Sequence, residues 1–481
     1  MTDELWRRTA REAVALLRRR EVSATELVSA ALARIEATDG AVNAVPTLCP
    51  ERALAQARRL EAEGPPDNPG PGHLYGLPIV VKDLTAVAGV RTTQGSPIFA
   101  DHVPASSDLL VERLEAKGAI VVGKSNTPEF GAGANTFNEV FGATRNPWDT
   151  RLTCGGSSGG SAVALATGQA WLATGSDLGG SLRIPGAFCG VVGFRASPGR
   201  VPHAPATNPF DRLGIHGPMA RNVRDVALML DAQCGEDARD PLSLPAPSTP
   251  FLEALEQTPP PRRIAWSADL AIAPVDREVA EICGRAAAWF RQVGAVVDEA
   301  APDLRDAQEL FQILRAYDFT LKRAPLLESH REQLKPEVVW NIEKGLAQSA
   351  EVVARAERAR GALYQRVLGF FQDHDLLCCP TVMVPPFPVE TRYVQEVEGV
   401  RFDNYVDWLM LTYAITLTEC PAISVPCGFT AAGLPVGLQI VGPPRGEARV
   451  LAAAARFEDA HDFAARVPVE PRRRHEPGAG G

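Results

Sequence analysis

The chain has 481 residues, of which 45% are hydrophobic and 22% are charged, and this ordinary globular composition excludes disordered, collagen-like and coiled-coil proteins. Its 58 acidic residues outnumber its 49 lysines and arginines, so the formal net charge at pH 7 is −9. Because proteins that grip nucleic acid need a basic face, this balance favours a small neutral substrate and no nucleic-acid partner.

Targeting and metal-binding signals are missing from the sequence. No stretch reaches the roughly 18 apolar residues of a membrane helix, and the first residues lack the apolar core of a secretory signal. The nine cysteines are scattered, odd in number and form no C-x-x-C pair, and no H-E-x-x-H motif occurs. We therefore expect a cytoplasmic protein with reduced thiols, no membrane contact and no metal.

Two amphipathic helices are predicted near the N-terminus, after a helical extension over residues 1–22. The first covers 23–40, where Ser23 and Glu26 have the spacing of a capping box. The second covers 51–63 and ends where glycines and prolines become frequent. From residue 76 to 201, short β-branched runs then alternate with helical stretches and glycine-rich turns, which predicts an α/β sheet. The β-type runs are 78–81, 119–122 and 190–194.

The second half of the chain continues with a helix over 221–231 and a proline-rich connection over 241–262. Helical periodicity dominates 276–374. We predict one domain over 23–465, whose single sheet is interrupted by this helical insertion, and a disordered tail over 466–481. The β-type runs that return after the insertion are 376–382, 421–429 and 434–444.

Three interpretations compete for the segment CGGSSGGS (154–161). A Walker-type phosphate loop is disfavoured because no lysine follows it. The G-x-S-x-G match around Ser157 is typical of a nucleophile elbow, yet residues 146–154 are polar and do not form the buried strand that an elbow needs. A flexible turn is the third interpretation. No histidine occurs in a context typical of a triad base, and we expect structural or surface roles for His203, His216, His330 and His374.

A second loop, GSDLGGSLRIP (175–185), again places a serine after paired glycines. Its backbone N–H groups could converge on one point, as an oxyanion hole requires, although a tight strand-to-helix turn explains the glycines equally well. Both interpretations stay open on the residues alone. The N–H groups in question belong to Leu178, Gly179, Gly180 and Ser181.

Without a histidine, the base that activates a serine would be a neutral lysine. Lys82 follows the apolar run 78–81, and Lys124 follows 119–122 in nearly the same context. Burial could lower the pKa of either amine, or either could extend its ammonium to solvent. The sequence pattern does not choose between the two lysines.

Together these segments resemble the amidase signature family of serine hydrolases, and in particular its general amidase and acylamidase branch. The resemblance covers about residues 23–462 and implies a three-layer α/β/α fold with a large mixed, mostly parallel central sheet. The motifs that carry it are GLPIVVKDL (76–84), GKSNTPEF (123–130), CGGSSGGSA (154–162), GSDLGGSLRIPGAFCGVVGFR (175–195) and PAISVPCG (421–428).

The resemblance also implies roles for individual residues. Ser181 would be the acylated nucleophile, Ser157 a bridging serine held by a cis peptide bond, and Lys82 the base, which resolves the choice of lysine. The oxyanion would bind the N–H groups of residues 178–181. A neutral Lys82 near pH 7 requires its pKa to fall from about 10.4 to about 7, and burial can lower it that far. The implied substrate-binding residues are Phe130, Gly131 and Ser158.

The implied reaction is hydrolysis of a carboxamide or acyl amide without a metal or an organic cofactor, and the implied assembly is a homodimer. Two residues near the motifs, Asp177 and Arg183, are expected to form a buried ion pair that braces the loop. Ser176 stands where the family usually has threonine, and FRASPGR (194–200) replaces a more usual leucine-lysine-proline-threonine run. A thiol nucleophile is disfavoured because nothing near Cys154, Cys189 or Cys420 would lower a thiol pKa.

Other functions share these catalytic residues. The tRNA-dependent glutamine amidotransferase has an A-type subunit of the same family, which delivers ammonia to a partner protein. The same acyl-enzyme chemistry also serves esters, carbamates and cyclic oligoamides. A catalytically inactive binding protein is disfavoured by the intact set of Lys82, Ser157 and Ser181.

Overall fold

The computed structural model describes residues 2–472. One mixed sheet of 11 strands runs through the molecule in the order β1-β3-β2-β8-β10-β9-β16-β17-β13-β11-β12. Its strands are β1 (Thr47–Leu48), β2 (Pro78–Lys82), β3 (Ile120–Ser125), β8 (Leu172–Asp177), β9 (Val192–Arg195), β10 (Ile215–Ala220), β11 (Arg263–Trp266), β12 (Val296–Glu299), β13 (Leu376–Pro380), β16 (Ala422–Phe429) and β17 (Pro435–Val441).

Parallel pairing is confined to two parts of this sheet. It joins β2 to β3 and β8, and β11 to β12 and β13, whereas the remaining neighbours are antiparallel. The predicted α/β class and mixed sheet are confirmed, but fewer strands are parallel than expected. The reason is that consecutive strands such as β16 and β17 are joined by a short hairpin, which forces antiparallel pairing.

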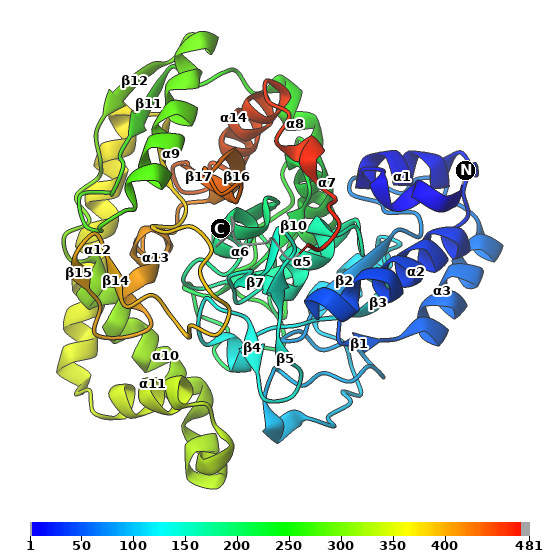
Figure 1. The fold of residues 1–481 in the computed structure, drawn as a ribbon, viewed down its shortest axis with the longest axis horizontal. Coiled ribbons are helices and arrows are strands. Elements are labelled where there is room, and N and C mark those ends of the chain that lie inside the picture. Colours follow the sequence, from blue (N-terminus) through cyan, green and yellow to red (C-terminus); the bar gives the residue numbers. More distant parts are fainter. Residues whose placement is uncertain (1, 473–481) are drawn as a thin grey trace, which may run out of the picture.

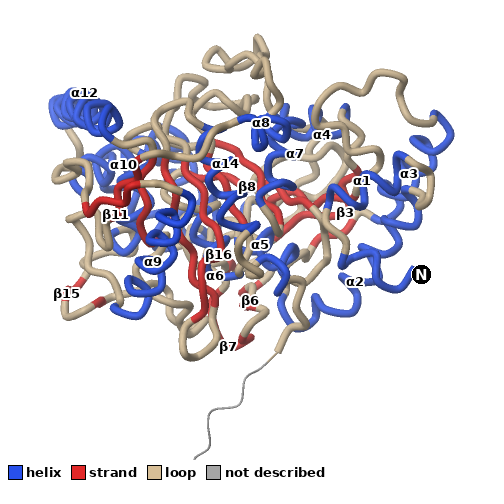
Figure 2. Tube along the Cα trace, turned by 90° about the horizontal axis from the view of Figure 1, so that it is seen from above, coloured by secondary structure: helices blue, strands red, loops and turns tan. Residues whose placement is uncertain are grey.

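Helices cover both faces of the sheet, as Figure 2 shows. In Figure 1, helices α1 to α3 lie beside β1 to β3 at one end, and α10 to α12 lie toward the end that carries β11 and β12. The helices are α1 (Ala10–Arg18), α2 (Ala24–Val42), α3 (Pro50–Glu63), α4 (Leu109–Ala116), α5 (Gly159–Ala166), α6 (Arg183–Cys189), α7 (Val223–Gln233), α8 (Phe251–Gln257), α9 (Arg277–Trp289), α10 (Ala307–His330), α11 (Pro336–Leu346), α12 (Ala350–Asp373), α13 (Met410–Thr416) and α14 (Glu447–Asp459).

Smaller elements lie outside the central sheet. Three two-stranded sheets pair β4 (Phe137–Asn138) with β5 (Gly142–Ala143), β6 (Arg145–Asn146) with β7 (Asp149–Thr153), and β14 (Glu396–Val397) with β15 (Val400–Arg401). The short 3₁₀ helices are Thr2–Arg7, Pro97–Phe99, Glu129–Gly131, Phe290–Val293, Arg331–Gln333, Asp407–Leu409 and Ala464–Arg466.

Local signals located most elements correctly. The capping box of Ser23 and Glu26 is present, and α2 begins directly after Ser23. The predicted helices at 51–63 and 221–231 correspond to α3 and α7, and the predicted strands correspond to β2, β3, β9, β13, β16 and β17. Strands β1, β8, β10, β11 and β12 were not predicted individually, and β12 lies inside the segment expected to be helical.

The C-terminal segment, expected to be a disordered tail, is described only as far as residue 472. Residues 473–481 lie outside the described residues. The described part of that segment packs on the domain, because Val469 N donates to Ala166 O at 2.8 Å and Arg472 N donates to Pro147 O at 3.2 Å. No helix among residues 2–472 combines the length and apolar character needed to cross a bilayer.

The parallel pairing of β2 with β8 positions the chemically important loops. Both strands end at the same edge of the sheet, so Lys82 at the end of β2 faces the residues that end β8. Strand β8 ends in Ser176 and Asp177, and the glycine-rich turn that follows leads into α6. Polar side chains from distant parts of the sequence therefore meet at this edge.

Candidate active site

Lys82 lies in a cluster of hydroxyl groups at the end of β2. Its side chain is only 1% exposed. Its Nζ lies 2.7 Å from Ser157 Oγ, 2.9 Å from Ser158 Oγ and 3.0 Å from Ser176 Oγ. Burial lowers the pKa of Lys82 from 10.5 to about 7, against a smaller opposing effect of Asp177. An amine with this pKa is available as a proton acceptor near neutrality.

Ser157 and Ser158 lie in the loop that joins β7 to α5. The Gly156–Ser157 peptide bond is cis, in keeping with the expectation for the bridging serine. Gly155 has a φ of +75°, in the left-handed region, and a Cβ on Gly156 would come within 2.9 Å of Thr136 Oγ1. The glycines thus allow the backbone to bring two consecutive hydroxyls to Lys82.

The strand before this loop differs from that of a nucleophile elbow. β7 pairs with β6 in a separate two-stranded sheet and forms one isolated bridge, from Leu152 to Pro388, so it is not a strand of the central sheet. The absence of a buried central strand directly before Ser157, expected from the polar sequence of 146–154, is therefore confirmed within the described residues.

Ser181 precedes α6 and lies at the wall of a cavity. Ser158 N donates to Ser181 O at 3.2 Å, which ties the two glycine-rich loops together. The cavity has a volume of about 390 Å³, and Ser157, Ser176 and Ser181 all line it. Lys82, Ser157 and Ser176 are therefore clustered beside a space that a small molecule can enter, and Ser181 lines the same space.

The N–H groups of the second loop are divided between two tasks. Gly180 N donates to Asp177 Oδ1 at 2.8 Å, and Leu182 N donates to Asp177 Oδ2 at 3.2 Å. Leu178, Gly179 and Ser181 line the cavity, and no protein acceptor for their N–H groups occurs among residues 2–472. Gly180, which we expected to contribute to an oxyanion hole, uses its N–H to hold the loop.

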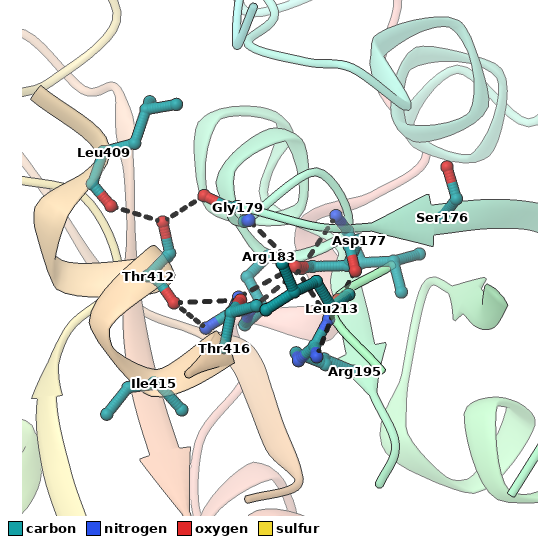
Figure 3. Close-up of polar contacts among 12 residues, drawn as sticks. Ser176, Asp177, Gly179, Arg183, Arg195, Leu213, Leu409, Thr412, Ile415 and Thr416 are labelled. Atoms are coloured by element: carbon teal, nitrogen blue, oxygen red, sulfur yellow. Dashed lines mark hydrogen bonds and ion pairs between the residues drawn. The ribbon is translucent and has the colours of Figure 1, made fainter. Parts of the chain in front are cut away.

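Asp177 is the hub of a buried ion-pair network (Figure 3). Arg183 donates to its two oxygens at 2.9 and 2.8 Å, which confirms the expected brace. Arg195 was missed by sequence reasoning and donates to the Asp177 carbonyl. The two guanidinium groups hold the pKa of Asp177 well below its usual range, although burial acts in the opposite direction and is the largest single influence. In Figure 3, Ser176 points away from this network.

Lys124 has a different environment from Lys82. In the pairing of β2 with β3, Lys124 lies opposite Val81, so its side chain and that of Lys82 alternate to different faces. Its Nζ lies 3.2 Å from Asp83 Oδ1 and 2.7 Å from Thr92 Oγ1. Of the two lysines that the sequence pattern left open, only Lys82 contacts the serines.

The three residues that we expected to bind the substrate do not all face the cavity. Phe130 and Gly131 line the cavity, whereas Ser158 is fully buried in the contact with Lys82.

Burial raises the pKa of Cys154 and of Cys420 to about 12, so these thiols stay protonated. Among residues 2–472, no group of three or more His, Cys, Asp or Glu side chains is arranged to hold a metal ion.

A charged face of α10, which sequence reasoning missed, forms another wall of the cavity. Lys322 Nζ lies 2.7 Å from Asp318 Oδ1 and 2.8 Å from Asp211 Oδ2. Charged residues spaced by three and four positions in an amphipathic helix could have indicated this face. The cavity-lining residues of α10 are the charged Arg315, Asp318, Lys322 and Arg323 together with Phe319.

Two histidines also belong to this cavity. His203 and His216, which we expected to be structural or surface residues, both line it, and their rings meet edge to face at 4.4 Å between centroids. Neither histidine contacts a serine hydroxyl through a hydrogen bond within the described chain. The site therefore contains no histidine-serine pair of the kind found in a Ser-His-Asp triad.

Comparison with known proteins identifies related sequences that match nearly the whole chain. A family model described as Amidase matches residues 26–451. An acylamidase of Rhodococcus erythropolis is 35% identical over 466 residues, covering 96% of this chain and 97% of the relative. The A-type subunit of the glutamyl-tRNA(Gln) amidotransferase from Moorella thermoacetica is also 35% identical, over 490 residues, covering 97% of this chain and 99% of the relative.

Solved structures show the same fold. A bacterial aryl acylamidase of the amidase signature family superposes with a TM-score of 0.88 at 29% identity, covering 95% of this chain and 97% of that chain. A 6-aminohexanoate cyclic dimer hydrolase superposes with a TM-score of 0.86 at 28% identity, covering 96% and 99%. With a family model that spans most of its length and relatives of this similarity, the chain belongs to the amidase signature family of hydrolases.

Proposed function

We propose that the chain hydrolyses the C–N bond of a small carboxamide or acyl amide through an acyl-enzyme on Ser181. The observation that carries this proposal is the 2.7 Å contact between Lys82 Nζ and Ser157 Oγ, made by a fully buried lysine whose pKa is lowered to about 7. Ser181 lines the same cavity as Ser157. A neutral amine, a relay hydroxyl and a nucleophilic hydroxyl are the parts that acyl transfer without histidine requires.

The hydrogen-bond count around Lys82 sets the direction of proton transfer. A neutral amine has two N–H donors and one lone pair. Ser158 Oγ and Ser176 Oγ can accept the two N–H groups, which leaves the lone pair for the hydroxyl of Ser157. Lys82 takes the Ser157 proton while Ser157 takes the proton of Ser181, whose oxygen attacks the amide carbon.

The remaining steps reverse this proton path. The carbonyl oxygen becomes an oxyanion, for which we assign the N–H groups of Leu178, Gly179 and Ser181 as donors, with Gly180 fixing the loop through Asp177. The C–N bond then breaks as the departing amine receives a proton from Ser157, and Ser157 regains one from Lys82. Water attacks the acyl-enzyme along the same path and releases the carboxylic acid.

We propose a linear acyl amide as the substrate type and the cytoplasm as the location, and the homodimer implied by the sequence resemblance stays a prediction. One second candidate is supported by the relatives, because A-type subunits of the amidotransferase are as similar to this chain as the acylamidase is. In that role the chain would release ammonia from glutamine for a partner protein. Esters, carbamates and cyclic oligoamides are further substrates of the same chemistry, and one structural neighbour hydrolyses a cyclic dimer.

Turnover by the purified chain alone tests the proposal. We expect hydrolysis of an acyl 4-nitroanilide without any partner, and no glutamine deamidation above background. The opposite pattern would favour the amidotransferase role. A fluorophosphonate probe should modify Ser181, located by mass spectrometry of the labelled peptide, and should not modify a Ser181→Ala variant. Failure to turn over any amide, or a label on another residue, would overturn the proposal.

A further inference from the structure

His216 lies in the wall of the cavity beside the proposed catalytic residues. It belongs to β10, where it pairs directly opposite Ser176 of β8. Ser176 in turn contacts Lys82, so the imidazole is one strand away from the proposed base. His216 and Ser181 line the same cavity.

The imidazole of His216 is buried and makes no hydrogen bond of ordinary geometry in the described part of the chain. It is 8% exposed, neither Nδ1 nor Nε2 forms such a bond among residues 2–472, and the backbone of Gly175 is the one polar group near enough to influence its pKa through a hydrogen bond. A buried polar group without a partner costs about 1–3 kcal/mol, and such groups are rare in native proteins. An unpartnered imidazole on a cavity wall is therefore a contact point for a molecule that occupies the cavity.

The surroundings of His216 keep its imidazole neutral. Burial, the ring of His203 and the amine of Lys82 together hold the pKa of His216 well below its ordinary value. A proton on His216 would also oppose the proton that Lys82 must receive during the reaction. His216 is thus unsuited to act as an acid or base, and a neutral imidazole offers one N–H donor and one acceptor nitrogen.

We propose that His216 is a specificity-determining residue that hydrogen-bonds a neutral polar group, such as a hydroxyl or a carboxamide, on the substrate close to the scissile amide. This inference rests on the proposed function for the identity of the scissile bond. His203 supports the site by packing edge to face against His216 at 4.4 Å, which fixes the plane of the ring. A substrate carrying a methyl group in place of the hydroxyl would leave the imidazole unpaired and bind more weakly.

The test measures binding, so that it does not depend on turnover. Dissociation constants are determined by calorimetry on the full chain carrying Ser181→Ala, with two pairs of ligands that differ by hydroxyl against methyl. The acyl pair is hydroxyacetanilide and propionanilide. The amine pair is the acetyl anilide of 3-hydroxymethylaniline and that of 3-ethylaniline.

We expect the hydroxyl member of at least one pair to bind tenfold or more tightly than its methyl partner. Adding His216→Phe should reduce this preference to less than twofold, whereas His216→Asn, which keeps a donor and an acceptor, should retain most of it. His374→Phe is the matched control, because His374 is also largely buried but lies outside the cavity. It should leave the preference unchanged.

A second measurement avoids the risk that His216→Phe fails to fold. In the Ser181→Ala chain, the ring ¹⁵N resonances of His216, assigned by their loss in His216→Asn, should shift with the hydroxyl ligand and not with the methyl ligand. Equal binding of both members of both pairs, no binding by either, or an unchanged preference in His216→Phe would overturn the inference. Turnover and labelling of Ser181 in the unmodified chain judge the proposed function separately.

Discussion

The ends of β2 and β3 carry two buried lysines with nearly identical local sequences and opposite environments. Lys82 is 1% exposed and contacts three serine hydroxyls. Lys124 is fully buried as well, but it forms an ion pair with Asp83 at 3.2 Å. The carboxylate that influences Lys82 is Asp177, which is already neutralised by Arg183 and Arg195.

The comparison shows that burial alone does not make a base. Burial lowers the pKa of both lysines, but Asp83 opposes this effect for Lys124 through its charge and its hydrogen bond. Around Lys82 the polar partners are neutral hydroxyls, which bring no negative charge to hold the amine in its protonated form. The neutral surroundings of Lys82 thus distinguish a proton acceptor from a structural cation.

Removing Lys82 should give the largest effect. Lys82→Ala leaves Ser157 without a proton acceptor, and we expect kcat/KM for an acyl anilide to fall about 10³-fold, within the range known for general-base catalysis. Lys117→Ala, which removes a lysine that contacts the Pro71 carbonyl far from the serines, is the control and should retain its activity. Circular dichroism should show both variants folded. A Lys82→Ala protein that keeps most of its rate would contradict the assignment of the base.

Removing Lys124 should act on stability and spare the chemistry. Lys124→Met leaves the buried carboxylate of Asp83 without its ion-pair partner, which typically costs about 3–5 kcal/mol. We expect a clear loss in the free energy of unfolding, measured with urea, and near-normal kcat per folded molecule. The double variant Lys124→Met with Asp83→Asn should recover part of the loss. A stable but inactive Lys124→Met would show that the two lysines were assigned the wrong way round.

Supplying Lys82 with a carboxylate should make it behave like Lys124. Because only the neutral amine accepts a proton, activity should rise with pH through about 7, the pKa of Lys82. Ser176 Oγ lies 3.0 Å from Nζ, so Ser176→Asp places a negative charge there and should raise the pKa by about 1–3 units. We expect the midpoint of the kcat/KM profile to move to higher pH, with about tenfold lower activity at pH 7.

The control for this change is Ser176→Asn, which matches aspartate in size but has no charge. Its profile should keep a midpoint near that of the unmodified chain, even if its overall rate is lower. Equal profiles for the aspartate and asparagine variants would mean that Lys82 does not set the pH dependence.

Local sequence determined much of the fold in advance. The capping box fixed the start of α2, and apolar runs of seven or eight residues located strands such as β16 and β17, because these signals depend on neighbours along the chain. Strands β11 and β12 were missed although β9 has the same length of four residues, because Arg263 begins β11, and Asp298 and Glu299 end β12, with charged side chains that interrupt the apolar pattern. The assignment of β11 depends on pairing with β13, more than a hundred residues later, and that of β12 depends on pairing with β11.

The residues of the candidate site, like the elements of the fold, were predicted from the sequence only in part. The motif resemblance indicated Lys82, Ser157 and Ser181, whereas physical reasoning from the residues left Lys124 equally possible. What separates the lysines is which carboxylate the fold brings near, and Arg195 and His216 entered the site only through strand pairing. Such contacts join residues far apart in sequence, so no local pattern carries them.

The smallest predicted effect is the influence of Lys82 on how stability changes with pH. The pKa of Lys82 is about 7 in the folded chain and 10.5 in the unfolded chain. Between these pH values the unfolded chain binds more protons at Lys82, so the folded chain becomes more stable as the pH rises. Lys82→Met has no such proton. The difference in free energy of unfolding between Lys82→Met and the unmodified chain should therefore become smaller by about 2 kcal/mol from pH 7 to pH 9. One unit of pKa difference corresponds to about 1.4 kcal/mol. Unfolding free energies of the two proteins at both pH values check this, and a difference independent of pH would mean that Lys82 is charged in the folded state.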